Sequence, residues 1–536
     1  MTNWKKIILT FFVFISCTII YLWLHESSTH TQNNTTSQTD SSNLQDNLYT
    51  TKKQWKDLSI QRGKELATRY CQSCHRLPDP SELNKENWQI TLAMMGPYLG
   101  IFNHNRQYYR FYSDVDMSYY PSRPAMTSSQ WQKIINYYMT KAPQVMPQQN
   151  RKKQIKRGLP YFELDFPPKL FYRNKNTASF IKVDTSVKPH RTFIHRAESN
   201  TFYLINNKLQ VLDSLETTGP IVDMDVQQNK MTVCKIGYDL LGKNTNDGSI
   251  AHLTVDEQNN IQLGEQQPLF NDLYRPVHVK STDLSGNHKN DYLISEFGLV
   301  NGGLLWKENK GNGKFTTHEI RPVAGAIKTN ILDYNHDGLP DLWTLFGQGE
   351  EGIFLFTNKG NNKFGQEQVL QFPPTYGSTS FELVDFNKNG YPDILYTAGD
   401  RGDGIPQLKP YHGVYIFINN GNNEFTQQYF FPLNGAIKAI ARDFDGDGNL
   451  DIAAIGLFTD SQQPEEGFIY LKNKGNFNFQ PYSLPVEANI KRAFSMDAAD
   501  IDNNGKLDLI IGNAFNGDKT KNKKGALFIV LKNTSF

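Results

Sequence analysis

The spacing of apolar residues changes along the chain. Residues 7–24 form one uncharged apolar run, whereas residues 25–50 hold few apolar side chains. Between residues 60 and 147, apolar residues recur at the three- and four-residue spacing of one helix face, and from about residue 160 the pattern becomes short apolar segments separated by turn residues. The pattern predicts a few short helices followed by a much longer β region.

Three helices are expected before residue 147. The first carries Gly63, Leu66, Ala67 and Tyr70 on one face and ends at Cys71. A second contains Trp88, Leu92 and Met95. The third begins with a capping box at Thr127, has an apolar face that starts at Trp131, and stops before Pro143.

The β region is built from repeats. The segments "DYNHDGLPDLWTLFG", "DFNKNGYPDILYTAG", "DFDGDGNLDIAAIG" and "DIDNNGKLDLIIG" share one template, and "DLSGNHKNDYLISEFG" is a diverged copy. They start 50 to 58 residues apart, and between them recurs a strand, turn and strand signature such as "LFTNKGNNKF". Strand repeats of this length predict propeller blades. Five marked units, and room for two more before Thr282, predict seven blades.

The Asp-rich loop of each unit has the ligand pattern of a calcium hairpin. Side-chain oxygens at positions 1, 3 and 5, a carbonyl at 7 and a carboxylate at 9 suit one hard cation, and Gly at position 6 permits the bend. The array resembles the FG-GAP or VCBS repeats of integrin-alpha-type propellers over roughly residues 215 to 536. The alternative is a hairpin closed by Asx-turns alone.

Four loops are expected to bind calcium in a structural role. The Asp283 loop is excluded, because it has weaker ligands and His288 in place of glycine. The candidate ligands, one loop after another, are Asp443, Asp445, Asp447 and Asp451; Asp333, Asn335, Asp337 and Asp341; Asp500, Asp502, Asn504 and Asp508; and Asp385, Asn387, Asn389 and Asp393.

The N-terminus predicts export and anchoring. Lys5 and Lys6 precede the apolar run of residues 7–24, which is just long enough to cross a bilayer. Lipoprotein processing at Cys17 is the alternative. Either form places the rest of the chain outside the cytoplasm, in a bacterial cell envelope, and residues 25–50 are expected to be a flexible linker.

The segment "RYCQSCHRLPDP" holds a Cys-x-x-Cys-His motif in a chain with four cysteines. Zinc would need a second ligand pair, and a thioredoxin-like redox pair would need a βαβ setting, so neither fits. The motif predicts one covalent haem c on Cys71 and Cys74 with His75 as axial ligand. A structural disulfide is the remaining alternative.

Residues 55 to 147 resemble a class I c-type cytochrome. The resemblance rests on Gly63, Leu66 and Tyr70 before the motif, and on "YPSRPAM" before the last helix. It implies that Met126 is the second axial ligand. Other methionines, His104 and an open sixth position compete with this assignment.

The expected fold class is therefore multidomain. It comprises a transmembrane helix (1–24), a linker (25–50), a small all-α cytochrome c domain (51–150) and a large all-β propeller (160–536). Lys+Arg 56 nearly balance Asp+Glu 54 without a long basic block, so nucleic acid is not an expected partner.

Three functions remain open. The first is a membrane-anchored cytochrome that transfers electrons to a redox partner protein, with a calcium-stabilised propeller that docks a partner or an extracellular polymer or carbohydrate. The second is a haem-linked oxidoreductase with its substrate site on the propeller. The third is an adhesion or ligand-binding propeller with a haem sensor. His278, Lys328, Lys438 and Lys491 are expected on the face opposite the calcium hairpins, where they either bind a ligand or pair with acids.

Overall fold

The computed structural model describes residues 41–102, 117–227, 230–240, 245–401, 408–516 and 524–535. The chain separates into two compact units, Met1–Ser59 and Ile60–Phe536. The predicted anchor (1–24) and residues 25–40 of the predicted linker lie outside the described residues. Helix α2 begins at Ser41, so the last ten residues of the predicted linker are helical.

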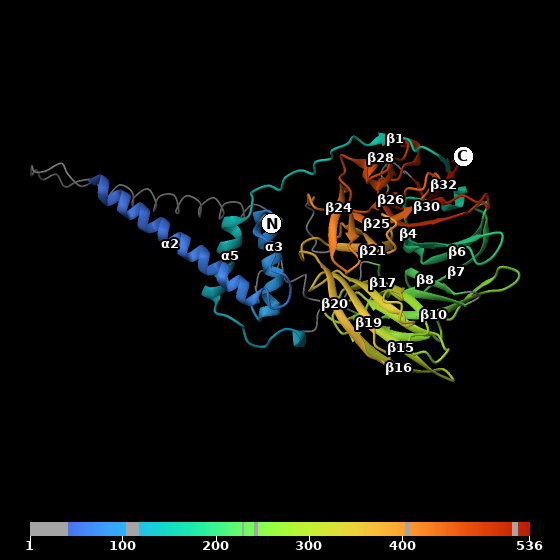
Figure 1. Ribbon diagram of the computed structural model, residues 1–536, viewed down its shortest axis with the longest axis horizontal. Helices are drawn as coiled ribbons and strands as arrows, with labels where there is room; N and C mark the ends of the chain where they lie inside the picture. The colour runs from blue at the N-terminus through green and yellow to red at the C-terminus, as the bar shows by residue number, and fades with distance from the viewer. Residues whose placement is uncertain are drawn as a thin grey trace, which may run out of the picture. The chain divides into compact units, whose positions relative to one another are not determined.

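The three expected helices near the start of the chain are present (Figure 1). They are α2 (Ser41–Tyr70), α3 (Lys85–Met95) and α5 (Ser128–Lys141). The capping box is confirmed, because the Gln130 amide donates to the Thr127 hydroxyl at 3.2 Å while the Gln130 side chain accepts from the Thr127 amide at 2.9 Å. Helix α2 ends directly before Cys71, as predicted.

The helices share one small apolar cluster. Leu66 and Ala67 of α2 pack with Trp88 of α3 and with Ile134 and Tyr138 of α5. The polar ends of the two large aromatic side chains are satisfied, since Trp88 Nε1 donates to the Pro80 carbonyl at 2.8 Å and the Tyr138 hydroxyl donates to the Pro78 carbonyl at 3.1 Å. Buried aromatic rings therefore hold the helices together.

Most of the described chain forms antiparallel four-stranded sheets, one for each propeller blade. In chain order the first three blades are β4 (Lys175–Asp184), β5 (Arg191–Arg196), β6 (Thr201–Asn206) and β7 (Val211–Glu216); β8 (Ile221–Gln227), β9 (Lys230–Lys235), β10 (Gly248–Val255) and β11 (Ile261–Leu263); and β13 (Pro276–Thr282), β14 (Asp291–Glu296), β15 (Gly303–Gly311) and β16 (Lys314–Arg321).

The next three blades follow the same order. They are β17 (Ala326–Leu332), β18 (Asp341–Phe346), β19 (Gly352–Asn358) and β20 (Phe364–Gln371); β21 (Ser378–Val384), β22 (Asp393–Ala398), β23 (Gly413–Asn419) and β24 (Phe425–Pro432); and β25 (Ala436–Arg442), β26 (Asp451–Gly456), β27 (Phe468–Asn473) and β28 (Phe479–Ser483).

The last blade is completed from both ends of the β region. It contains β29 (Ala493–Ala499), β30 (Asp508–Asn516) and β32 (Phe528–Asn533), and its outermost strand is the early strand β2 (Phe162–Asp165), which pairs antiparallel with β32. This pairing closes the ring, because the start of the β region supplies the outermost strand of the last blade. Four short strands lie outside this scheme: β1 (Lys156–Arg157) pairs with β28, β3 (Tyr172–Arg173) pairs with β31 (Gly525–Ala526), and β12 (Phe270–Leu273) pairs with β10.

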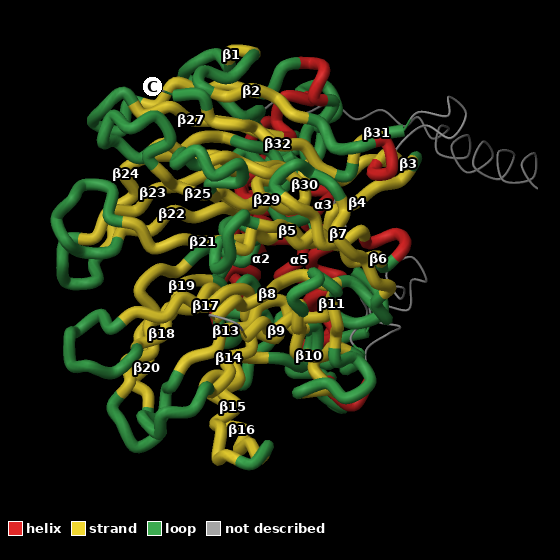
Figure 2. Tube along the Cα trace, turned by 90° about the vertical axis from the view of Figure 1, so that its right-hand side faces the viewer, coloured by secondary structure: helices red, strands yellow, loops and turns green. Residues whose placement is uncertain are grey.

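Within the described ranges the blades number seven, and their first strands form a closed circle. Each of β4, β8, β13, β17, β21, β25 and β29 contacts the next, and β29 contacts β4. Figure 2 shows these strands around the centre of the ring. The second strands β14, β18, β22 and β26 are buried at every position, which explains their nearly continuous apolar sequences.

The expected fold class is wrong for the N-terminal part of the chain. The structure is mostly β, and the helices after Ser59 belong to the same compact unit as the propeller, so a separate all-α cytochrome domain is not formed. The Thr375 hydroxyl donates to the Glu82 carboxylate at 2.6 Å, and the Tyr411 hydroxyl donates to the Glu82 carbonyl at 2.9 Å. These bonds tie the helical segment to blade residues.

The expected membrane helix, residues 1–24, lies outside the described residues, and no such helix is found among the described ones. Of the helices in residues 41–102 and 117–535 that the structure describes, none is long and apolar enough to cross a membrane. The longest, α2, is rich in polar and charged residues.

Candidate functional site

Each Asp-rich loop connects the first strand of a blade to the second. The first aspartate of the loop accepts backbone amides from inside it: Asp333 from Asp337 at 3.1 Å and from Gly338 at 3.0 Å. Gly338 has φ +83°, and the glycines at the same position of the other three candidate loops have φ +84° to +86°. This left-handed backbone explains the glycine at position 6.

The aspartate at position 9 has a second role that the sequence did not reveal. Its fully buried carboxylate accepts the backbone amide of an asparagine at or near the end of the blade's third strand, as Asp451 does from Asn473 at 2.7 Å. The same bond joins Asp291 to Asn309, Asp341 to Asn358, Asp393 to Asn419 and Asp508 to Asn533, at 2.7 to 2.8 Å. The asparagine belongs to the repeated turn signature, whose recurrence was the available signal.

The structure brings predicted calcium ligands together in two loops. The carboxylates of Asp443, Asp445 and Asp447 approach one another within 4.8 Å, and those of Asp500, Asp502 and Asp508 do the same. Asp451 stands apart from the first group, because it accepts from Asn473 and from the Tyr470 hydroxyl. Burial raises the pKa of Asp451 and of Asp508 to about 6.

In the other two candidate loops the structure describes no group of three converging carboxylates, and these loops are held by internal hydrogen bonds as the first two are. The Asn335 amide donates to Asp337 at 2.9 Å, and the Asn389 backbone amide donates to both Asp385 and Asn387 at 3.1 Å. Asp341 and Asp393 serve in these blades as the buried acceptors for Asn358 and Asn419. Each loop therefore already has an Asx-turn network without a cation.

A lysine lies beside the most acidic loop. Lys472 Nζ forms an ion pair with Asp445 and lies 3.7 Å from Asp447. The other oxygen of Asp445, Oδ1, is buried and has no hydrogen-bond partner among the described residues. An unpaired buried carboxylate oxygen between two further carboxylates fits a cation ligand.

Charged side chains line the channel around which the first strands are arranged. Four carboxylates on these strands accept backbone amides of the next blade: Asp223 from Val279, Asp225 from Ser281, Glu382 from Ala441 and Asp497 from Val183, at 2.9 to 3.0 Å. These acids connect neighbouring blades near the axis, a role that the sequence analysis missed.

The predicted basic residues lie in two places. His278, Lys328 and Lys438 lie on first strands and interact electrostatically with the channel acid Asp223, whereas Lys491 is an exposed residue before β29. Burial lowers the pKa of His278 to about 4, so its imidazole is neutral at pH 7. The channel cations are therefore lysines and Arg442.

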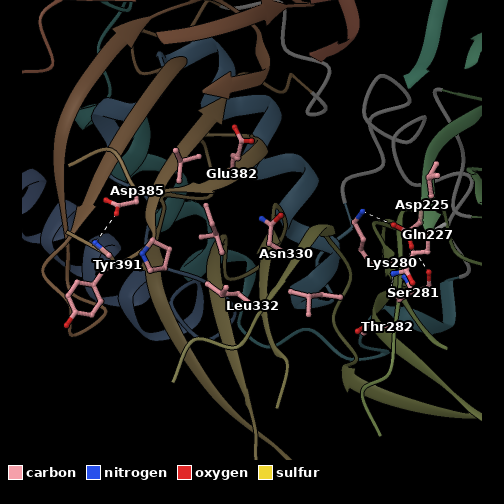
Figure 3. Close-up of a pocket in the computed structure, with 16 residues that line it drawn as sticks. Asp225, Gln227, Lys280, Ser281, Thr282, Asn330, Leu332, Glu382, Asp385 and Tyr391 are labelled. Atoms are coloured by element: carbon pink, nitrogen blue, oxygen red, sulfur yellow. Dashed lines mark hydrogen bonds and ion pairs between the residues drawn. The ribbon is translucent and has the colours of Figure 1, made fainter. Parts of the chain in front are cut away.

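A cavity of about 680 Å³ lies at the ends of strands β8, β13, β17 and β21. It is lined by Asp225, Lys280, Asn330 and Glu382, and it reaches residues of the Asp385 loop (Figure 3). The first strands end on the side of the blades that carries the Asp-rich loops. The cavity thus opens on the calcium-loop face, opposite to the face proposed from the sequence.

The Cys-x-x-Cys-His motif forms a turn directly after α2. Cys71 is half-buried, Cys74 is exposed, and both thiols are free. Burial and the nearby Cys74 raise the pKa of Cys71 to about 11. His75 Nδ1 lies 2.8 Å from the Arg76 carbonyl, which fixes the ring and leaves Nε2 available for a ligand.

Met126 lies in the same apolar cluster that Cys71 borders. The methionine is 5% exposed, and its neighbours in the cluster include Leu66, Trp88 and Ile134. The structure therefore places the predicted axial ligand and one attachment cysteine around a common core.

Comparison with known families identifies the repeats. The family described as "FG-GAP-like repeat" matches residues 333–396 and 443–511. The ring is a β-propeller that contains FG-GAP-like repeats. Each match covers two consecutive Asp-rich loops: the first contains the Asp333 and Asp385 loops, and the second contains the Asp443 and Asp500 loops.

A curated relative matches part of the chain. The "T-cell immunomodulatory protein homolog" of Plasmodium falciparum (isolate 3D7) is 26% identical over 131 residues, which cover 23% of this chain and 18% of the relative. The match thus spans less than a fifth of that protein's length.

Three similar solved structures have a sequence identity of 9% to this chain. The match to the N-terminal domain of Nup159 has a TM-score of 0.42 and covers 72% of this chain and 99% of that domain. The match to the Dos1 propeller has a TM-score of 0.39 and covers 68% of this chain and 81% of that one. The match to Sqt1 of Saccharomyces cerevisiae has a TM-score of 0.43 and covers 69% of this chain and 100% of that one.

Proposed function

We propose that the FG-GAP propeller is a binding module for an extracellular polysaccharide and that it works in a bacterial cell envelope. The observation that carries the proposal is the polar cavity on the calcium-loop face. Its wall offers donors and acceptors on Gln227, Thr282 and Asn330, and Tyr391 at its edge is 45% exposed. Mixed polar groups beside an exposed aromatic ring suit a polyhydroxyl ligand.

A catalytic role is less well supported by the same cavity. The Asp225 carboxylate accepts hydrogen bonds from Ser281 and Lys280. The Glu382 carboxylate accepts hydrogen bonds from Ala441 and Arg442. Acids held in this way connect blades and do not form a poised acid and base pair. The binding function accordingly accounts for more of the cavity.

Calcium belongs to this proposal as a structural ion. We assign it to the Asp443 and Asp500 loops, where three carboxylates converge. Bound there, the cation would neutralise the loop acids and fix the hairpin between the first and second strands of the last two blades.

The test is retention of the purified full chain on immobilised dextran, alginate and chitosan, which are neutral, acidic and basic polymers. Saturable retention on at least one polymer, displaced by the same polymer in solution and without release of new sugar ends, is the expected result. Absence of saturable retention on all three, or cleavage of the polymer, would overturn the proposal.

We propose as a second function that the turn after α2 carries a covalent haem that exchanges electrons with a partner protein. Two free thiols three residues apart and the oriented His75 ring support attachment, and Met126 in the adjoining cluster supplies a candidate sixth ligand. When bound, the haem would supply one-electron chemistry. Cys71 and Cys74 would hold it, and His75 would orient it.

The haem proposal is tested on chain produced together with a c-type haem attachment system. The expected result is a haem band that survives denaturing electrophoresis in the wild type and disappears in the Cys71→Ala, Cys74→Ala double variant. Ser73→Ala is the matched control in the same turn. Wild-type chain without attached haem would contradict the proposal.

A further inference from the structure

A lysine inside the propeller channel makes no direct contact with an acid among the described residues, although Glu382 and Asp223 act on it at longer range. Lys328 lies on β17 and is half-buried, and among the described residues its ammonium group has neither a hydrogen bond nor an ion pair. Burial and, to a smaller extent, the neighbouring Lys438 lower the pKa of Lys328 to about 8, against the opposite effect of Glu382 and Asp223. An ammonium group in this position is destabilising unless an anion accompanies it.

The channel acids are held by donors other than Lys328. Asp225 accepts from Lys280 and Ser281, Glu382 from Arg442 and Ala441, and Asp497 from Val183. Asp223 accepts from the Val279 amide at 2.9 Å. Each carboxylate is already committed to a backbone amide of the next blade.

The balance of charge in the channel is positive. The four acids are Asp223, Asp225, Glu382 and Asp497, and the five cations are Lys182, Lys280, Lys328, Lys438 and Arg442. Lys438 gives one hydrogen bond, to the Met496 carbonyl at 2.8 Å. Two neighbouring lysines thus retain donors for an incoming oxygen anion.

The cavity lies next to these lysines along the strands, and neither lysine is part of its wall. Asn330 lines it two residues beyond Lys328 on the same strand, so both side chains leave the same side of β17. Asn330 Nδ2 is buried and has no acceptor among the described residues. Figure 3 shows Asn330 between Glu382 and Lys280.

We propose that the channel mouth on the calcium-loop face is an oxyanion site, in which Lys328, Lys438 and Asn330 bind the carboxylate or sulfate group of a ligand. The anion enters through the cavity, accepts from Asn330 Nδ2 near its wall, and lies against the two ammonium groups deeper in the channel. Charge-assisted hydrogen bonds of this kind favour carboxylate and sulfate over neutral hydroxyl groups. The inference rests on the proposed function, since it names the chemical group of the polysaccharide that the propeller recognises.

The test is calorimetric titration of the purified full chain, at constant ionic strength and calcium, with sodium glucuronate, sodium sulfate and glucose. We expect one saturable site for each anion and none for glucose. Tighter binding of glucuronate than of sulfate shows that the cavity also contacts the sugar, and equal binding shows recognition of the anionic group alone; both support the site.

Variants connect the binding to the named residues. Lys328→Met is expected to weaken anion binding at least tenfold, as for the loss of one charge-assisted hydrogen bond. The matched control is Lys314→Met, an exposed lysine on β16. If Lys328→Met does not fold, Asn330→Asp takes its place, because it puts a second negative group where the anion binds.

Three results would overturn the oxyanion site: no saturable heat with either anion, glucose binding as tight as glucuronate, or unchanged anion binding in Lys328→Met. Such a failure is separable from failure of the proposed function. Saturable retention of the chain on neutral dextran, with no anion binding in calorimetry, removes the oxyanion site and leaves the polysaccharide-binding module in place.

Discussion

The buried carboxylate of Asp291 accepts the backbone amide of Asn309 at 2.7 Å, and it also accepts the amides of Leu284 and Ser285 at 3.1 Å. One side chain thereby joins the Asp-rich loop to the third strand of its blade. The equivalent bond occurs in the four following blades. It is the most regular polar contact of the propeller.

Replacing Asp291 by Asn is therefore expected to destabilise the chain. The Nδ2 group cannot accept, so at least one of the three backbone amides is left unpaired, at a cost of about 1–3 kcal/mol. Urea unfolding measures the change. Because the Asp283 loop is not expected to bind calcium, the same loss is expected with calcium and with chelator.

The control for Asp291→Asn is Glu257→Gln, an exposed acid in a turn of an early blade. It is expected to change the free energy of unfolding by less than about 0.5 kcal/mol. A calcium-dependent effect of Asp291→Asn would instead make Asp291 a metal ligand.

Lys472 is expected to compete with calcium at the Asp443 loop. Its ammonium pairs with Asp445, which is one of the three converging carboxylates. Removing this cation in Lys472→Gln should raise calcium affinity about three- to tenfold, because the loop acids then attract the ion without a competing charge. Calorimetric titration with calcium measures the affinity.

Two further variants define the calcium experiment. Lys474→Gln, an exposed neighbour, is the control and should leave the affinity unchanged. Asp502→Asn weakens the separate Asp500 loop and so isolates the Asp443 site. Equal calcium affinity in Lys472→Gln and wild type would show that the lysine leaves the loop freely or that calcium does not bind there.

The buried carboxyl group of Glu351 is expected to make stability fall as the pH rises from about 4 to about 8. It is buried between blades and accepts the backbone amide and the hydroxyl of Ser378, both at 2.6 Å. Burial raises its pKa to about 8, whereas an unfolded glutamate titrates near ~4.3. Between these values the native state holds a proton that the unfolded state has lost, so stability is full below about pH 4 and falls as pH rises through 8.

Thermal unfolding between pH 5 and 9 checks this prediction. Glu351→Gln should flatten the pH dependence and remove a loss on the order of 2–4 kcal/mol above pH 8. Glu367→Gln, an exposed acid on β20, serves as the control. Parallel pH profiles of Glu351→Gln and wild type would contradict the assignment.

The parts of the fold that local patterns determine were predictable. The capping box at Thr127 and the end of α2 before Cys71 follow from the residues beside them. The repeated Asp-rich loops likewise predicted the blades, because each loop marks the same step between two strands. The sequence shows an aspartate at position 9 of each loop. Its role as a buried hydrogen-bond acceptor was not predictable, because the donor is an asparagine about 20 residues away.

The association of the helices with the propeller could not be predicted from such patterns. Glu82 and Thr375 are 293 residues apart, and neither lies in a repeat signature. The ion pairs of the channel could not be predicted either. Asp225 and Lys280 lie on consecutive blades and form a pair only when these blades pack side by side. The resemblance to a cytochrome therefore located a motif correctly on a helix end but suggested a separate domain that the contacts do not form.

The segment between the helices and the propeller supplies the last prediction. Arg151 donates from Nε to the Pro432 carbonyl at 3.0 Å and pairs with Glu466, whose side chain is fully buried. Arg151→Met leaves that carboxylate without its cation, which costs about 3–5 kcal/mol for a buried pair.

Arg157→Met in the same segment is the control, because its ion pair with Glu465 is half-exposed and is worth at most about 1 kcal/mol. Urea unfolding of Arg151→Met, Glu466→Gln and the double variant measures the coupling: the double variant should lose less than the sum of the two single losses, and additive losses would mean that the two side chains stabilise the blade independently.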